Sequence, residues 1–287
     1  MQSVCKHATR AMFMRGDSTE SVREFYERTA RDYDKEYEVP YWKLYNEITW
    51  ENIKQFLPKR RKAIILDVGG GTGYWAIRLA KHGYRVVLTD ISENMLKVAS
   101  EKIKMEKLKD KIETRNVDIR DMSCFPSNSF DLAIAEGDPV SYCLNAEKAV
   151  RELARVVKEN AHVIVSVDNE YTTISRILIP GMIQENFSEK ASNKLSQFLK
   201  TGRLKTDFEF QAFTPEGLKA LFETCGLQVI RMIGKPILAQ LIPREKREEI
   251  IKNNFTKILK RELKFCDASS LVGIGGHLEI VGLKRLG

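Results

Sequence analysis

The segment Leu-Asp-Val-Gly-Gly-Gly-Thr-Gly at residues 66–73 constrains the fold of this chain more than any other feature. The apolar run 63–66 that leads into it is typical of a buried parallel strand. Residues 76–80 then show the apolar spacing of a helix, and Gly83 supplies its stop. A strand, a glycine turn and a helix form the cradle in which α/β proteins hold nucleotide-like cofactors. Glycine suits that turn because a Cβ would block a ligand lying against the backbone.

The spacing of the glycines narrows the choice of cofactor. With Gly69 and Gly71 in place, the dinucleotide fingerprint G-x-G-x-x-G would need a glycine at Tyr74, so a nicotinamide enzyme is disfavoured. The observed Asp67-x-Gly69-x-Gly71-x-Gly73 instead resembles motif I of class I S-adenosylmethionine (SAM) methyltransferases. The resemblance implies that the three glycines cradle SAM. We expect Asp67 to order the loop through backbone N–H groups.

The pattern of strands and helices agrees with an α/β fold. Apolar strand patterns alternate with helical ones through the first 168 residues, as in a doubly wound parallel sheet. Strands are expected at 63–68, 84–90, 112–117, 130–136, 161–167, 227–234 and 277–284, and helices at 73–82, 92–107, 145–158, 215–225 and 244–264. Ser92 is expected to be the N-cap of the second of these helices. The resemblance implies a Rossmann-like, mostly parallel seven-stranded sheet whose last strand is antiparallel.

The chain divides into a core with additions. The expected divisions are a flexible arm 1–19, an N-terminal helical cap 20–58, the SAM-binding core 59–168, a cap insertion 169–212, more core 213–234, a second insertion 235–275 and the last core strand 276–287. Within the first cap, the segment 25–34 looks like that of the subgroup that methylates quinones and other small molecules. Both insertions follow strand ends on the ligand edge, so we expect three caps over one enclosed, partly apolar pocket.

Composition limits the partners and the compartment. The formal charge is +8, but basic and acidic residues are interleaved, as at 101–104 and 247–249, which is typical of solvated helix faces. The basic balance alone would suit nucleic acid, but the interleaving favours a small molecule, and nucleic acid is retained only as the alternative partner. The five cysteines are widely spaced and form no C-x-x-C, which favours a reducing cytoplasm and predicts neither a disulfide framework nor a metal site. No apolar run approaches the ~20 residues of a membrane span. A homo-oligomer is compatible with the sequence.

Several residues would bind SAM. Asp90 ends the second strand, where a carboxylate can accept hydrogen bonds from both ribose hydroxyls. By resemblance, Asp118 accepts from the adenine amino group, Ile119 packs on the ring and Met95 covers it. Each also has a plainer interpretation, as a turn-capping Asp90, a solvated Asp118 or a core Met95. The expected cofactor-binding set is completed by Tyr33, Ile91 and Glu136.

Methyl transfer needs alignment of nucleophile, methyl and sulfur, and in some cases removal of a proton. Residues 136–142 follow the fourth strand and should face the methyl group, which makes Tyr142 a catalytic candidate. This segment distantly resembles the Asp-Pro-Pro-Tyr motif of amino methyltransferases, but Val140 and Ser141 replace its second proline and aromatic residue. Cys143 is interpreted as a buried thiol.

Topology selects one of the four histidines. If the last strand is antiparallel, its start lies at the ligand edge, and His277 can reach a substrate. We expect it to act as a general base or to orient the substrate; the alternative is a satisfied histidine at a strand end.

The sequence thus predicts a cytoplasmic SAM-dependent methyltransferase that acts on an oxygen, nitrogen or carbon atom of a small molecule and releases S-adenosylhomocysteine. Two alternatives stay open. One is an RNA or protein methyltransferase that uses the basic helix at 244–264. The other is a non-catalytic SAM-binding scaffold or sensor.

Overall fold

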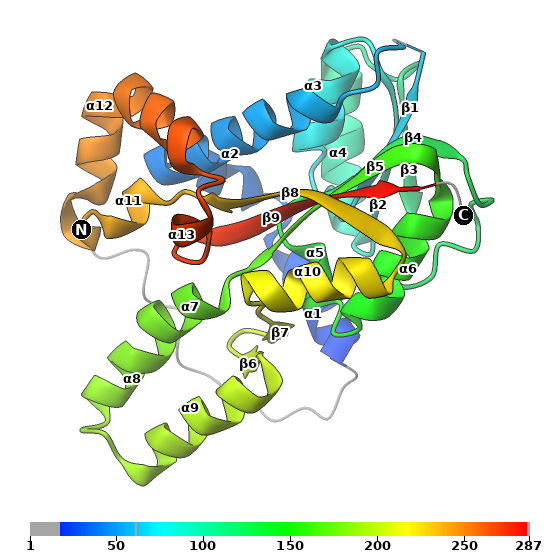
Figure 1. Cartoon of the computed structure of the whole chain (residues 1–287). Coiled ribbons are helices and arrows are strands. Elements are labelled where there is room, and N and C mark those ends of the chain that lie inside the picture. Colours follow the sequence, from blue (N-terminus) through cyan, green and yellow to red (C-terminus); the bar gives the residue numbers. More distant parts are fainter. Residues whose placement is uncertain (1–17, 61, 286–287) are drawn as a thin grey trace.

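A twisted seven-stranded sheet forms the centre of the computed structural model, which describes residues 18–60 and 62–285 (Figure 1). The strand order is β3-β2-β1-β4-β5-β9-β8, and β9 runs antiparallel to both of its neighbours. The predicted fold class is confirmed. The strands are β1 Ile64–Val68, β2 Arg85–Asp90, β3 Ile112–Asn116, β4 Phe130–Ala135, β5 Val157–Asp168, β8 Leu227–Lys235 and β9 His277–Lys284.

Helices cover both faces of the sheet. On one face lie α2 Pro40–Ile53, α3 Tyr74–Lys81 and α4 Glu93–Met105, which share an apolar core with the central strands. On the other lie α6 Ala146–Val156 and α10 Pro215–Thr224. Central parallel strands are apolar on both sides because each side packs against helices. This explains why β1 and β4 read as continuous hydrophobic runs.

The end of α6 differs from the predicted helix 145–158. The helix ends at Val156, and Val157 takes an extended conformation (φ −78°, ψ 149°) and pairs with Phe130 of β4. As a result β5 begins at Val157, before the expected start at 161. The apolar spacing of a helix continues past Val156, so the sequence pattern could not mark the boundary that pairing with β4 imposes.

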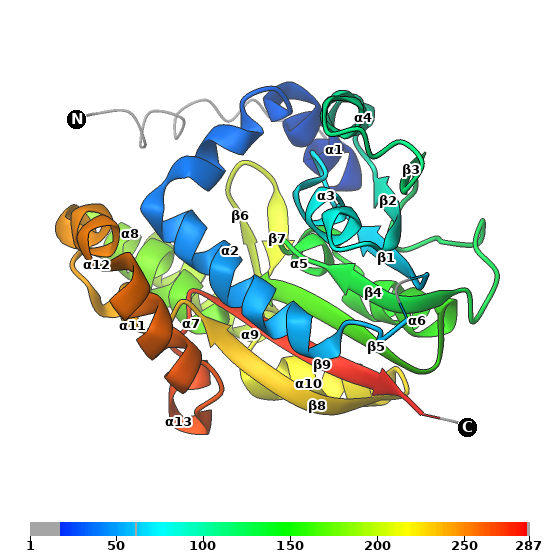
Figure 2. The ribbon, with the colours of Figure 1, turned by 90° about the horizontal axis from the view of Figure 1, so that it is seen from above.

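The N-terminal cap consists of α1 Ser18–Thr29, the 3-10 helix η1 Tyr33–Glu38, α2 and η2 Lys54–Phe56. Of the arm predicted at 1–19, residues 1–17 lie outside the described residues. Helix α2 packs against α12 Arg244–Phe265 of the second insertion, through a cluster that contains Leu44, Ile48 and Ile251 (Figure 2). The rest of that insertion is α11 Leu238–Leu241 and α13 Ser269–Val272.

The insertion at 169–212 forms α7 Glu170–Thr173, the π-helix η3 Ile174–Leu178, α8 Ile179–Gln184, α9 Glu189–Thr201 and a hairpin of β6 Arg203–Lys205 and β7 Glu209–Gln211. The hairpin was not predicted, because strands of three residues carry too little alternation to be recognised. It buries Leu204 and Phe210 against Phe198 of α9. Between α4 and α6 the chain also adds the short helix α5 Pro139–Tyr142. Within the described ranges, no helix is long and apolar enough to cross a membrane.

Candidate functional site

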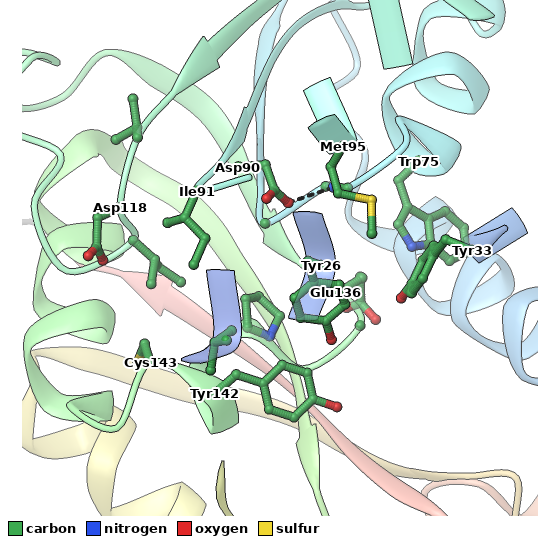
Figure 3. Close-up of a pocket in the computed structure, with 18 of the residues that line it drawn as sticks. Tyr26, Tyr33, Trp75, Asp90, Ile91, Met95, Asp118, Glu136, Tyr142 and Cys143 are labelled. Carbon is green, nitrogen blue, oxygen red and sulfur yellow. Dashed lines mark hydrogen bonds between the residues drawn. The ribbon is translucent and has the colours of Figure 1, made fainter. Parts of the chain in front are cut away.

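A pocket lies where the carboxyl ends of β1, β2 and β4 meet α1 and η1 (Figure 3). Its lining residues are Val22, Tyr26, Tyr33, Tyr37, Gly69, Gly70, Gly71, Trp75, Asp90, Ile91, Met95, Val117, Asp118, Ile119, Glu136, Gly137, Pro139, Tyr142 and Cys143. The N-terminal cap contributes four of these. The two insertions contribute none, so the expectation that three caps cover the pocket is wrong at the level of direct contact. The 169–212 segment packs behind the lining instead.

The glycine loop forms the floor of the pocket. Gly69 has φ +65°, and a Cβ there would come within 2.7 Å of the Pro139 Cβ. Gly71 has φ +54°, and in the described part of the chain, its two neighbours apart, the Met95 sulfur at 4.0 Å is the only atom within 4 Å of its hypothetical Cβ. A side chain at Gly71 would therefore enter the pocket itself. Gly73 caps α3 and faces Ala99 of α4, away from the pocket lining.

Asp90 organises this loop. One carboxylate oxygen accepts a hydrogen bond from Gly71 N (2.9 Å), and the other accepts from Ser92 N (2.8 Å). The side chain lines the pocket, and its burial raises its pKa to about 6 despite these two hydrogen bonds. Ser92 caps α4 by accepting from Met95 N, as the sequence predicted. Each carboxylate oxygen has further lone pairs, so Asp90 can hold the loop and still accept from a ligand.

Asp67 does not have the role predicted for it. It is fully buried behind the loop, lies outside the lining of the pocket, and accepts no hydrogen bond from the N–H groups of the described glycine loop. The backbone N–H that favours its ionised form is that of Ala76, in the first turn of α3. Burial raises its pKa to about 7. Asp90 is the carboxylate that accepts a loop N–H, because the end of β2 lies directly beneath Gly71. The sequence identified both Asp67 and Asp90 as candidate site residues, but it did not show which carboxylate faces the loop.

At the far end of the pocket, Asp118 and Ile119 follow β3. Arg120 binds the Asp118 carboxylate through its Nε (3.0 Å) and Nη2 (2.6 Å). Burial opposes ionisation of Asp118, but the hydrogen bonds from Arg120 outweigh it and lower its pKa. Part of the acceptor capacity of Asp118 is therefore already used within the chain.

Glu136 follows β4 and is held by a buried lysine. Lys235 Nζ donates to Glu136 Oε2 (2.6 Å), to Thr49 Oγ1 (2.7 Å) and to Glu279. Lys235 and both carboxylates have no exposed side-chain surface. Glu136 Oε1 has no hydrogen-bond partner among the described residues, and Glu136 lines the pocket. The sequence analysis missed Lys235. Its position at the end of the apolar strand β8 is the sequence signal that could have identified it as a buried charge.

Aromatic rings form the wall opposite the glycine loop. Tyr142 contacts Phe208 (ring centroids 5.0 Å apart) and Tyr26 (6.3 Å), and Tyr26 also contacts Tyr33 (5.9 Å). Burial raises the pKa of Tyr142 well above its usual range, so the hydroxyl stays protonated. Tyr26 was not among the predicted site residues, although it lies one helical turn after Val22, which also lines the pocket. Cys143 is a buried lining residue whose pKa burial raises to about 11, consistent with an unreactive thiol.

His277 lies at the ligand edge, where the antiparallel direction of β9 was expected to put it. It is not among the lining residues of the pocket, but its Nδ1 is 2.8 Å from Asp138 Oδ2. Burial alone would lower the pKa of His277, and the charge of Asp138 outweighs it and raises that pKa. Asp168 lies opposite His277 in the β5–β9 register. One ligand atom from each of Asp138, Asp168 and His277 lies within 4.8 Å of the others, a cluster that the sequence analysis did not foresee.

The first comparison with known proteins concerns the core. Residues 65–160 match a family model described as a methyltransferase domain. A demethylmenaquinone methyltransferase from Bacteroides fragilis is 33% identical over 147 residues, which cover 47% of this chain and 56% of the relative. This chain thus spans just over half the length of that relative.

Two further proteins match over more of the chain. The tRNA 5-carboxymethoxyuridine methyltransferase of Escherichia coli is 20% identical, over 83% of this chain and 87% of the relative. Among solved structures, a chain in the complex of the Haloferax volcanii Trm112 methyltransferase activator with a methyltransferase superimposes with a TM-score of 0.59. It has 16% identity and covers 94% of this chain and 99% of its own. That likeness extends the shared fold to the β8–β9 end of the sheet.

Proposed function

We infer that this chain is a class I SAM-dependent methyltransferase, because residues 65–160 match a methyltransferase domain. On that premise we propose that it binds SAM in the pocket above β1, β2 and β4 and methylates a small molecule. The observation that supports this most directly is the pairing of Gly71 with Asp90. A loop residue whose side chain would fill the pocket is hydrogen-bonded to a buried carboxylate that lines the same pocket. This fits a ligand with vicinal hydroxyls lying against bare backbone.

The remaining lining residues fit the other parts of SAM. Under the proposal, Asp90 accepts from the ribose hydroxyls, Ile91, Met95 and Ile119 enclose the adenine, and Asp118 accepts from its amino group. The free oxygen of Glu136 accepts a hydrogen bond from the ammonium group of the methionine part of SAM. Tyr33 closes over the carboxylate of that same part. When bound, SAM supplies an electrophilic sulfonium methyl. The protein then has to exclude water, align the acceptor and take up a proton.

The acceptor is proposed to enter from the side of Tyr26 and Tyr142. Their rings, with Phe208 behind them, form an apolar wall that suits a small molecule with an aromatic or aliphatic part. The N-terminal segment 25–34 supports the same assignment, because it carries Tyr26 and Tyr33 into the pocket. The proposal includes a reducing cytoplasm, since Cys124, Cys143, Cys225 and Cys266 are all unpaired.

Calorimetric titration with SAM, S-adenosylhomocysteine and NAD tests the cofactor assignment. Asp90→Ala should weaken SAM binding about ten- to a hundredfold, since a charge-assisted hydrogen bond contributes about 1.5–3 kcal/mol. The matched control is Asp110→Ala, at an exposed position outside the pocket lining, and it should leave the affinity unchanged. Folded protein that binds NAD and not SAM would reject the proposal. Turnover on an acceptor panel separates an enzyme from a SAM-binding scaffold.

An RNA acceptor is the second candidate. It is favoured by the net charge of +8 and by the likeness to the E. coli tRNA methyltransferase over most of both chains. Salt-dependent retention on immobilised tRNA, lost as ionic strength rises, would support it. Charge reversal of basic residues on α12 should then reduce retention without changing SAM affinity.

A further inference from the structure

A second polar cluster adjoins the pocket where Gly137 and Pro139 line it. Asp138 follows β4 and lies between Gly137 and Pro139, which both line the pocket. Asp168 ends β5, and His277 begins β9 opposite it in register. Strands that are far apart in the sequence bring these three side chains to one edge of the sheet. No residue of this cluster has a part in the proposed cofactor contacts.

Two carboxylates face one imidazole in this cluster, so ionisation of both leaves a surplus of negative charge even when His277 is protonated. Burial and the charge of Asp138 oppose that ionisation and raise the pKa of Asp168 to about 7. Asp138 is only 3% exposed, and its polar neighbours are His277, which faces Oδ2, and Ser166. No hydrogen bond to Oδ1 is formed among the described residues. A buried carboxylate oxygen without a hydrogen-bond partner destabilises the folded protein, and a bound cation would offset that loss of stability. The arrangement is therefore suited to one more positive group.

Three aromatic side chains, Trp42, Tyr45 and Tyr142, adjoin the cluster and indicate the kind of cation. The His277 ring lies 5.1 Å from that of Tyr45 and 5.7 Å from that of Trp42, centroid to centroid. Tyr142, from the pocket wall, hydrogen-bonds to Asp168. Aromatic faces attract alkylammonium groups, whereas a divalent metal ion needs several oxygen or nitrogen ligands in their place.

We propose that Asp138, Asp168 and His277 bind the ammonium group of an amine, beside the pocket. The proposal of an amine site depends only on the geometry of the cluster and not on the proposed function. The further step, in which this amine is the methyl acceptor, rests on the proposed function. It narrows the acceptor from a small molecule in general to an organic amine.

The chemistry of that step balances with the residues present. The bound ammonium gives one proton to the Asp168 carboxylate, which exposes a lone pair on nitrogen. That lone pair forms the new N–C bond while the C–S bond breaks and its electron pair stays on sulfur. The amine leaves as a methylammonium ion, and the proton on Asp168 passes to solvent. Asp138 and His277 hold the nitrogen in line with the methyl group.

Choline and its uncharged carbon isostere 3,3-dimethyl-1-butanol probe the site without turnover. We would titrate each by calorimetry into the full chain, alone and with S-adenosylhomocysteine. Choline should bind at least about tenfold more tightly than the isostere. Asp138→Asn and Asp168→Asn should each weaken choline binding by about tenfold or more. They should leave S-adenosylhomocysteine affinity within about twofold, and Asp110→Asn should change neither.

The outcomes separate this inference from the proposed function. Equal binding of choline and the alcohol, or choline binding that survives both substitutions, would overturn the amine site. Saturable Mg²⁺ or Mn²⁺ binding that these substitutions abolish, with no choline binding, would also overturn it. Choline binding that Asp138→Asn abolishes, in a protein that does not bind S-adenosylhomocysteine, would uphold the amine site and reject the proposed function.

Discussion

Gly69 illustrates how a single residue constrains the site. Its φ of +65° lies in the left-handed region, and its hypothetical Cβ would collide with Pro139, the residue that begins α5. Pro139 follows β4, so the close approach joins the glycine loop to the segment expected to face the methyl group. Backbone conformation and space therefore both require glycine at this position.

Gly69→Ala should lower the free energy of unfolding by more than about 2 kcal/mol, because it adds a steric clash to a left-handed backbone cost of about 1–2 kcal/mol. It should also weaken SAM binding. Gly226→Ala is the matched control, since Gly226 has φ +80° and no atom of the described residues beyond its two neighbours lies within 4 Å of its hypothetical Cβ. Urea unfolding and calorimetry measure both effects. Equal losses in the two variants would show that the Pro139 contact contributes nothing.

The raised pKa of Asp67 predicts how the free energy of unfolding depends on pH. Its folded pKa of about 7 lies above the ordinary value of 3.8, so between these values the folded protein keeps a proton that the unfolded chain has released. Its contribution to stability is therefore fully present below about pH 4 and is lost as the pH rises through about 7. Asp67→Asn should remove this loss and reduce the fall in stability between about pH 5 and pH 8 by more than about 1 kcal/mol. Parallel pH curves for the two proteins, measured by urea unfolding, would contradict this.

At the scale of elements, Lys235 connects four segments that the sequence keeps apart. It ends β8 and bonds to Thr49 of α2, to Glu136 after β4 and to Glu279 of β9. Asn52 of α2 also donates to Glu279. Through this network the N-terminal cap is attached to Glu136, a lining residue of the pocket. One oxygen of Glu136 is held so that the other stays free for a ligand.

Lys235→Met should destabilise the protein by about 3–5 kcal/mol, because it leaves two buried carboxylates without a counter-charge. Adding Glu279→Gln should recover part of that loss, since one of the two charges is removed. Lys54→Met, which breaks an exposed pair with Glu51, should cost no more than about 1 kcal/mol. Thermal unfolding of the four proteins measures this order, and a Lys235 variant as stable as the Lys54 variant would refute the role of the network.

At the scale of the whole molecule, ligand binding should change the amide hydrogen exchange of some elements and not of others. The pocket takes Val22 and Tyr26 from α1 and Tyr33 and Tyr37 from η1, whereas α12 lies against the outer side of α2. S-adenosylhomocysteine should therefore slow amide hydrogen exchange in α1 and η1 and leave α12 unchanged. Hydrogen-exchange mass spectrometry with and without the ligand tests this. Unchanged exchange in α1 and η1 at saturating ligand would contradict the pocket as described.

The local features could be read from the sequence alone. The glycine loop, the buried strands β1 and β4 and the Ser92 cap depend on residues that are close in the chain, so spacing and residue type were sufficient. The position of His277 at the ligand edge followed once the last strand was taken as antiparallel. The assignment of Asp67 to the loop was wrong because a motif does not show which way a side chain turns.

Only the tertiary structure could decide which distant side chains meet. The cluster of Asp138, Asp168 and His277 exists because β5 lies between β4 and β9, and Lys235 is neutralised because β8, β9 and α2 converge beneath Glu136. The structure also shows that the N-terminal cap lines the pocket while neither insertion contributes a lining residue. Local signals report the conformation of a segment, whereas these contacts depend on strand order and on how the helices pack over the sheet.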